Sequence, residues 1–205
     1  MPHSYSAIQI WKQCPRRYNE EVLLRRWKSP ESPAARLGTE IHRTLETCLN
    51  TGRPIPDGCR VPNGILPLLR STGAKAEVRL SIDRLGGPAE WDTAYLRGVI
   101  DVFARPDENS IFMIDWKTGK SRYVSTMQAH IYAAMCLPFG EGVSVTFAFC
   151  FLQEGRSWLL RLSPEDCWKR VKVLLSAIDS ASNYPATPAG HCRFCPVATC
   201  EHKRG

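Results

Sequence analysis

The sequence predicts an α/β domain (α+β in the wider sense) in which helices flank a mixed β-sheet. The chain has 205 residues, which is enough for one well-buried domain and too few for two ordinary ones. Its apolar fraction of 43% is that of a globular protein. The pattern runs from helices to strands, a helix, strands and a last helix, which fits a sheet covered by helices. We therefore treat residues 1–205 as a single domain, made of a basic N-terminal segment (1–33), a core (34–183) and a cysteine-rich tail (184–205).

Helical spacing of apolar residues predicts four long helices. Their ranges are 6–27, 34–50, 123–137 and 163–182. In the second, a stripe of leucine and isoleucine is predicted to be buried: Leu37, Ile41, Leu45 and Leu49. The fourth begins with Ser163-Pro164-Glu165-Asp166, which supplies a capping hydroxyl and a proline at the first helical position. The Pro- and Gly-rich stretch 51–73 is predicted to be a surface excursion with one short helical turn.

Alternating apolar residues predict five strands. Their ranges are 77–82, 95–104, 110–117, 143–152 and 156–162. The turn-like residues 105–109 join the second and third strands into a hairpin. The fourth strand is rich in Val and Phe and is predicted to lie in the interior of the sheet.

The net charge of +7 favours anionic partners such as nucleic acid. Basic residues crowd the first segment, and Arg16, Arg17, Arg25 and Arg26 are the candidate DNA contacts. The alternative is a solvated helix face. No apolar run approaches the length of a membrane span, and the N-terminus lacks the regions of a secretory signal. We expect a soluble, cytoplasmic protein.

Two carboxylates stand at or near the ends of apolar strands, Asp101 and Asp115. Side chains alternate along a strand, so Asp115 and Lys117 point to the same face, and the hairpin brings Asp101 close to them. Converging carboxylates repel each other unless a cation lies between them, and an oxygen-rich site suits Mg²⁺ or Mn²⁺. Lys117 would then orient a water or stabilise developing negative charge. In the alternative, Lys117 is only a salt-bridge partner of two strand-end carboxylates.

Five short motifs in a fixed order carry a family resemblance: Cys14-Pro15-Arg16-Arg17-Tyr18, a helical His42, Gly98-x-x-Asp101, Asp115-x-Lys117 and Gln128-x-x-x-Tyr132. Together they resemble the RecB-like branch of the PD-(D/E)XK nuclease superfamily, along nearly the whole chain. The resemblance implies a restriction-endonuclease-like fold.

The resemblance also implies a role for each matching residue. His42, Asp101, Asp115 and the backbone carbonyl of Trp116 would ligate the metal, and Lys117 would be the catalytic lysine. Gln128 and Tyr132, one helical turn apart, would line the site and hold DNA. Taken by itself, His42 could be a satisfied core histidine, and Gln128 and Tyr132 could equally serve helix packing. We assign no role to Glu77, which heads a strand.

The tail places Cys192, Cys195 and Cys200 in one short loop, and three close thiols favour zinc or iron–sulfur ligation. In the RecB-like branch that includes AddB-type and CRISPR-associated exonucleases, an early cysteine before proline joins such a trio around a [4Fe–4S] cluster. Cys14 matches that position, so the resemblance implies a metal clasp between the two ends of the chain. The last gap is one residue shorter than is usual in the family, which leaves Zn²⁺, with His191 or His202 as fourth ligand, as an alternative. The other thiols are expected to be core residues: Cys48, Cys59, Cys136, Cys150 and Cys167.

These features lead us to expect a metal-dependent DNA exonuclease that hydrolyses phosphodiester bonds in single-stranded DNA or at DNA ends. The resemblance implies work in recombination, repair, phage replication or CRISPR adaptation in a prokaryotic or phage-infected cell. The chain lacks a Gly-x-x-x-x-Gly-Lys phosphate-binding loop, so unwinding would need a helicase or a recombination or CRISPR-adaptation partner. Two alternatives are a catalytically silent DNA-binding or adaptor module and a zinc-stabilised RNA-binding protein, although the second leaves the carboxylates unexplained.

Overall fold

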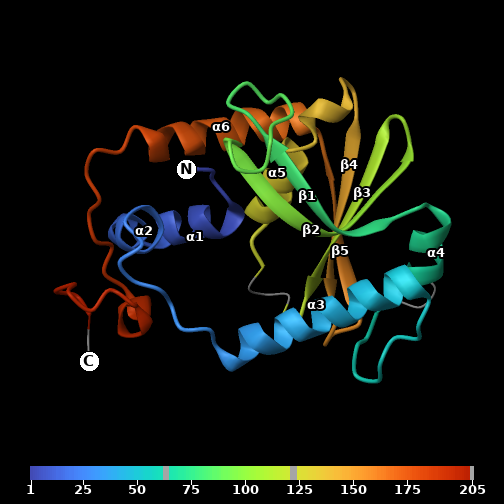
Figure 1. Cartoon of the computed structure of the whole chain (residues 1–205), viewed down its shortest axis with the longest axis horizontal. Helices are drawn as coiled ribbons and strands as arrows, with labels where there is room; N and C mark the ends of the chain where they lie inside the picture. Colours follow the sequence, from blue (N-terminus) through green and yellow to red (C-terminus); the bar gives the residue numbers. More distant parts are fainter. Residues whose placement is uncertain (62–64, 121–123, 204–205) are drawn as a thin grey trace.

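A five-stranded mixed sheet in the order β1-β2-β3-β4-β5 forms the centre of the fold (Figure 1). The computed structural model describes residues 1–61, 65–120 and 124–203. The strands are β1 (Lys75–Ile82), β2 (Leu96–Asp107), β3 (Ser110–Lys117), β4 (Ser144–Phe151) and β5 (Arg156–Leu162). Only the β3–β4 pair is parallel; the other three neighbouring pairs are antiparallel. The five predicted strands and the mixed sheet are confirmed, although β2 continues to Asp107 through part of the predicted turn.

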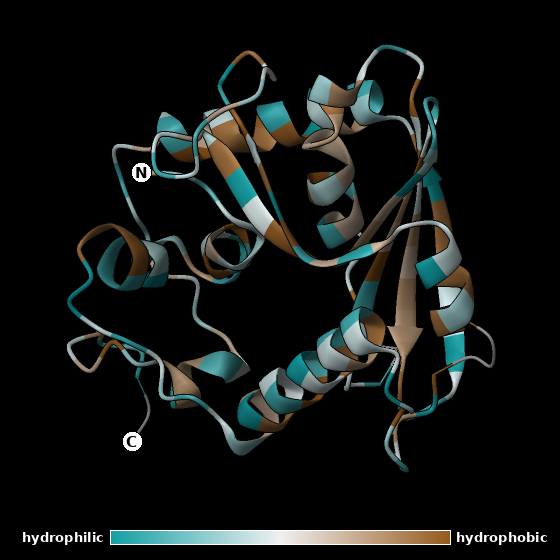
Figure 2. Ribbon diagram, turned by 45° about the vertical axis from the view of Figure 1, so that its right-hand side comes forward, coloured by the Kyte–Doolittle hydropathy of each residue, from teal (hydrophilic) through white to brown (hydrophobic). Residues whose placement is uncertain are grey.

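Helices cover both faces of the sheet (Figures 1 and 2). The α-helices are α1 (Tyr5–Gln13), α2 (Pro15–Tyr18), α3 (Pro33–Thr51), α4 (Ile65–Ser71), α5 (Met127–Ala134) and α6 (Pro164–Asp179), with shorter turns η1 (Asn19–Leu23), η3 (Leu137–Phe139) and η4 (Gly190–Phe194). Apolar side chains of α5 and α6 pack with Met113 and Phe147 on one face. Those of α3 and α4 pack with Ile114 and Trp116 on the other. Within the described ranges, no helix is both long and apolar enough to cross a membrane.

The N-terminal segment departs from the single helix predicted over 6–27. Cys14 is extended (φ −164°, ψ 111°) and ends α1, and Pro15 then begins α2. Proline has no amide hydrogen for the helical ladder, and it disfavours helical geometry in the residue before it. The prediction of one continuous helix is therefore wrong, and the break leaves the Cys14 thiol at a junction between helices.

The second predicted helix is confirmed as α3, but its buried stripe is shorter than expected. Leu45 and Leu49 are buried, whereas Leu37 is 53% exposed. Figure 1 shows the reason, because the first turns of α3 extend past the sheet and only its later turns pack against it. His42 lies between these two parts.

Two other helical predictions need correction. The stretch 51–73 contains more than a surface turn, because α4 buries Leu66 and Leu69 against α3. The helix predicted over 123–137 is shorter, since α5 runs from Met127 to Ala134 and the chain then continues into η3. Residues 121–123, on which the predicted start falls, lie outside the described residues.

Candidate active site

The β2–β3 hairpin brings the two predicted carboxylates together. Val102 faces Ile114 in the ladder, so Asp101 falls opposite Asp115 in the same register. The Asp101 carboxylate accepts a hydrogen bond of 2.7 Å from the backbone N–H of Trp116. Lys117 Nζ lies 2.6 Å from Asp115 Oδ2, as expected for two residues on one strand face.

The imidazole of His42 reaches this hairpin from α3. Its Nε2 lies 2.8 Å from the carbonyl oxygen of Trp116, and its Nδ1 lies 3.2 Å from Asp101 Oδ1. Both partners are acceptors, so the ring satisfies both only as the doubly protonated cation. Burial lowers the pKa of His42, but the hydrogen bond to Asp101 and its negative charge outweigh burial, and the net shift is upward. In the metal-free protein His42 therefore supplies positive charge at the point where the predicted ligands converge, and it would ligate a cation only after losing a proton from one ring nitrogen.

Asp115 is a buried carboxylate with an incomplete set of partners. Its Oδ1 accepts a hydrogen bond of 2.5 Å from Gln128 Nε2. Its Oδ2 forms an ion pair with Lys117 Nζ at 2.6 Å, although without the geometry of a hydrogen bond, and the same ammonium donates to Gln128 Oε1 at 2.7 Å. Burial raises the pKa of Asp115 to about 6, against the opposing effect of Lys117 and with a further increase from Asp101. The buried carboxylate therefore depends on positive charge beside it, which Lys117 supplies in the metal-free protein.

Gln128 and Tyr132 project from α5 toward the site in different ways. Gln128 contacts both Asp115 and Lys117 and fixes their relative position. Tyr132 is buried, and its hydroxyl donates to the carbonyl of Val99 at 2.8 Å. A Cβ atom at Gly98 would lie only 2.7 Å from the Tyr132 ring, so the Gly98-x-x-Asp101 spacing reflects close packing of α5 on β2.

Glu77 is the site residue to which the sequence analysis gave no role. Its neighbours Ala76 and Val78 pair with Val102 and Ile100, so Glu77 lies level with Asp101, although these two residues do not themselves form a ladder pair. The ligand atoms of His42, Glu77 and Asp101 all lie within 4.8 Å of one another. These three residues line an open cleft of about 290 Å³. An exposed glutamate at the start of a strand gives no local signal, so only the register with β2 identifies it.

The backbone at Glu77 is strained. Its φ of 52° is in the left-handed region, which costs a non-glycine residue about 1 kcal/mol or more. Val78 packs toward α5 and α6, whereas Ala76, two residues earlier, packs toward α3 and α4. β1 therefore turns over at Glu77, which breaks the regular alternation predicted for this strand and leaves the Glu77 carboxylate beside Asp101.

These residues fit a hard divalent cation. Carboxylates, a backbone carbonyl and one imidazole form an oxygen-rich donor set of the kind that Mg²⁺ and Mn²⁺ accept. The Asp115 Oδ2 atom already faces Lys117, and Asp115 lies outside the group of ligand atoms that are mutually close in the metal-free protein. Among the described residues, the His42, Glu77 and Asp101 set is the one group with mutually close ligand atoms.

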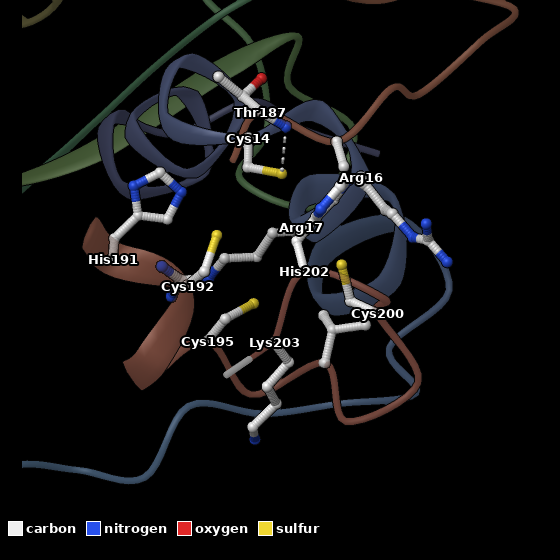
Figure 3. A pocket seen from close by; sticks show the side chains of 12 residues that line it. Cys14, Arg16, Arg17, Thr187, His191, Cys192, Cys195, Cys200, His202 and Lys203 are labelled. Atoms are coloured by element: carbon white, nitrogen blue, oxygen red, sulfur yellow. Dashed lines mark hydrogen bonds between the residues drawn. The ribbon is translucent and has the colours of Figure 1, made fainter. Parts of the chain in front are cut away.

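The four cysteines of the predicted clasp line a common pocket, although they do not form such a close group. Cys14, Cys192, Cys195 and Cys200 come from both ends of the chain and surround it together with His191 and His202 (Figure 3). The backbone N–H of Thr187 donates to the Cys14 sulfur at 3.4 Å. Of the other thiols, all but Cys59 are buried, as expected.

The candidate DNA-binding arginines do not form one stripe. Arg17 is held by Glu21 (2.7 Å), Gln13 (2.5 Å) and Ser29 (2.8 Å). Arg16 pairs with Glu201 at 2.5 Å, and Arg26 lies 3.5 Å from Glu20. Arg25 is exposed and has no ion pair among the described residues. Of the four, Arg25 is therefore the side chain that is most available to an anionic partner.

The titration of this site predicts how the stability of the metal-free protein depends on pH. The folded-state pKa of Asp115 is raised to about 6 from an ordinary 3.8. The contribution of Asp115 to the free energy of unfolding is fully present below its ordinary pKa. It is lost as the pH rises through the folded-state pKa, and the total loss is about 3 kcal/mol. The raised pKa of His42 acts in the same direction above its ordinary 6.5. Urea unfolding should show a shallower fall of stability with pH in Asp115→Asn than in the wild type.

Added Mn²⁺ provides a second measurement of the same effect. A cation at the site favours the ionised carboxylate, so Mn²⁺ should raise the unfolding temperature more at about pH 7 than at about pH 5. The Asp115→Asn protein should lose most of this difference. Equal pH profiles for the two proteins would contradict the titration of Asp115.

Comparison with known proteins agrees with this geometry. The family model of the PD-(D/E)XK nuclease superfamily matches residues 65–200, which include Asp101, Asp115 and Lys117 but neither His42 nor Cys14. The crystal structure of SSO0001 shares the fold, with a TM-score of 0.53 and 17% sequence identity over 97% of this chain and 86% of that chain. No curated protein matches the sequence. Since the family match covers more than half of its length, the chain belongs to the PD-(D/E)XK nuclease superfamily.

Proposed function

We propose that the protein is a divalent-metal-dependent DNA exonuclease that hydrolyses phosphodiester bonds in single-stranded DNA or at DNA ends. The observation that carries this proposal is the group of close ligand atoms from His42, Glu77 and Asp101, next to the strand that carries Asp115 and Lys117. A purely structural salt bridge would need only Lys117 and one carboxylate. The group formed by His42, Glu77 and Asp101, with ligand atoms within 4.8 Å of one another, is better explained by a metal-dependent site.

His42, Asp101, Asp115 and the Trp116 carbonyl would hold Mg²⁺ or Mn²⁺, with Glu77 as an additional ligand at the open side of the cleft. A divalent ion bound there supplies Lewis acidity and charge neutralisation for phosphodiester hydrolysis. Lys117 is held between Asp115 and Gln128, where its ammonium can orient the attacking water or stabilise negative charge developing on the phosphate. Tyr132 supports the site through its bond to Val99.

A second component of the proposal is a [4Fe–4S] cluster held by Cys14, Cys192, Cys195 and Cys200. Support comes from their position around one pocket, which draws ligands from both ends of the chain. Four thiolates are the ligand set of such a cluster. A Zn²⁺ ion that uses His191 or His202 in place of Cys14 is the alternative, because both imidazoles line the same pocket. The cluster would have a structural role, since the active site does not include these residues.

Anaerobically purified protein should degrade a 5′- or 3′-labelled single-stranded oligonucleotide when Mn²⁺ or Mg²⁺ is present, and not in EDTA. Successive shortening from a labelled end would identify an exonuclease, and a sealed circular single strand should resist cleavage. Binding without cleavage in both metals would favour the silent DNA-binding module. Any helicase or recombination partner would act upstream by supplying the single strand.

A further inference from the structure

An aromatic groove lies next to the active site and has no role in the metal chemistry. It has a volume of about 740 Å³ and lies between the N-terminal segment and the start of β2. We name it by the residues used below: Tyr5, Arg25, Trp27, Lys28, Trp91 and Arg97. This volume is typical of a ligand-binding site.

The groove adjoins the active site on two sides. Val99 lines both the groove and the cleft that contains His42, Glu77 and Asp101. Tyr5 lines both the groove and a smaller cleft formed by Lys117 and Gln128. A polymer that occupies the groove would therefore extend directly to the metal-binding residues.

The charge of the groove suits a polyanion. Arg25 and Lys28 are exposed and form no ion pair within the described ranges. The acidic lining residue Glu21 is already neutralised, because it accepts from Arg17 and from the backbone N–H of Ser29. The balance of the groove is therefore positive, and exposed arginine and lysine are the usual contacts of a phosphate backbone.

Arg25 occupies a backbone position that normally favours glycine. Its φ is 53°, and the N–H of Arg26 donates to the carbonyl of Glu20 at 2.9 Å, which closes the preceding helical turn. Glycine is the common residue at such a left-handed cap because it adopts this conformation without strain. Arginine at this position destabilises the fold, and the exposed side chain in the groove gives a functional reason for its presence.

The aromatic rings suit unpaired bases. Trp27 is half-buried in the groove wall and makes no ring contact among the described residues. Trp91 is already covered by two guanidinium groups, with Arg97 at 4.8 Å and Arg79 at 5.1 Å from its ring centroid, so a base would stack on Trp27 instead. Single-strand binding sites combine such stacking surfaces with cationic side chains. A duplex hides the faces of its bases and cannot use these rings.

We propose that the aromatic groove binds single-stranded DNA, with a base stacked on Trp27 and phosphates held by Arg25 and Lys28, and delivers it to the metal-binding residues. The role in delivery rests on the proposed nuclease function. The binding itself does not, because the groove contains none of the metal-binding residues. The same contacts explain selection of single strands over duplex.

The test measures binding in EDTA by fluorescence anisotropy, so that cleavage does not enter. The wild type should bind a labelled single strand more tightly than a blunt duplex of the same length. Trp27→Ala should weaken binding of the single strand by roughly 5- to 150-fold, the effect of losing one stacked base. Trp158→Ala removes a partly exposed tryptophan from β5 and should bind like the wild type.

The Arg25→Gly variant distinguishes a loss of DNA binding from a loss of stability. Glycine relieves the left-handed strain, so the melting temperature should stay the same or rise, while affinity falls and the log–log salt slope decreases by about 0.7. Arg53→Ala, a change of an exposed arginine outside the groove, should alter neither affinity nor slope.

The proposal would be overturned if Trp27→Ala and Arg25→Gly both bound single-stranded DNA with wild-type affinity. It would also be overturned if the wild type bound duplex DNA as tightly as single-stranded DNA, or if the groove bound RNA alone. If these binding effects appear and no metal supports cleavage, the nuclease function fails and the groove remains a single-strand site. If cleavage occurs and the two variants bind normally, the groove assignment fails and the nuclease function remains.

Discussion

The Asp115→Asn protein is expected to cleave single-stranded DNA at least about 10²-fold more slowly than the wild type. Asparagine keeps the shape of the side chain but removes the charge that faces Lys117 and would hold the cation. Asp101→Asn should be equally damaging, because its carboxylate contacts both His42 and the Trp116 amide. Single-turnover rates at saturating Mn²⁺ measure the loss in the chemical step.

Lys117→Ala distinguishes the catalytic lysine from the metal ligands. This variant should also lose cleavage, yet it should keep its affinity for Mn²⁺, since an ammonium group does not ligate a cation. Calorimetric titration of Mn²⁺ should therefore show weaker binding in Asp115→Asn and Asp101→Asn only. Asp107→Asn, at the exposed end of β2, is the matched control and should behave like the wild type. Full activity in Asp115→Asn would exclude the proposed active site.

The Cys14→Ala protein is expected to lose colour, iron and thermal stability together. Anaerobically purified wild type should be brown and contain about four iron and four sulfide ions per chain. A cluster shared by Cys14 and the C-terminal trio closes almost the entire chain into a loop, which in chain-entropy terms is worth about 5 kcal/mol. The melting temperature should fall by about 10 to 20 °C. Iron analysis and thermal unfolding monitored by circular dichroism measure the two effects.

Cys195→Ala should reproduce the Cys14→Ala result, because both thiols line the same pocket. Cys48→Ala and Cys150→Ala remove buried thiols from the sheet-facing core and should keep the colour. A colourless protein that contains about one zinc ion and does not respond to Cys14→Ala would instead indicate a local site in the tail. The active site is separate, so that result would leave the nuclease proposal unchanged.

Sequence periodicity alone determined the five strands and the position of Asp115 and Lys117 on one face of β3. These features are local: a strand alternates its side chains every two residues whatever surrounds it. The β2–β3 hairpin also follows from a short turn between two apolar runs, and it places Asp101 beside Asp115. Pro15 also acts locally: it disfavours helical geometry at Cys14, so α1 ends there and the single helix predicted over 6–27 is wrong.

Only the tertiary structure decided the features that depend on contacts between distant segments. The role of Glu77 depends on its register with β2 and on a strained φ that no residue pattern announces. Arg17 is held by hydrogen bonds to Glu21, Gln13 and Ser29. Arg25 instead lies in a left-handed turn and lines the groove. Two similar arginines of one segment therefore have different surroundings. The sequence by itself therefore determined the strands and the carboxylates on them, because backbone sterics act locally. The tertiary structure decided which other side chains join them, because that choice is made by the packing of α1, α3 and α5 around the sheet.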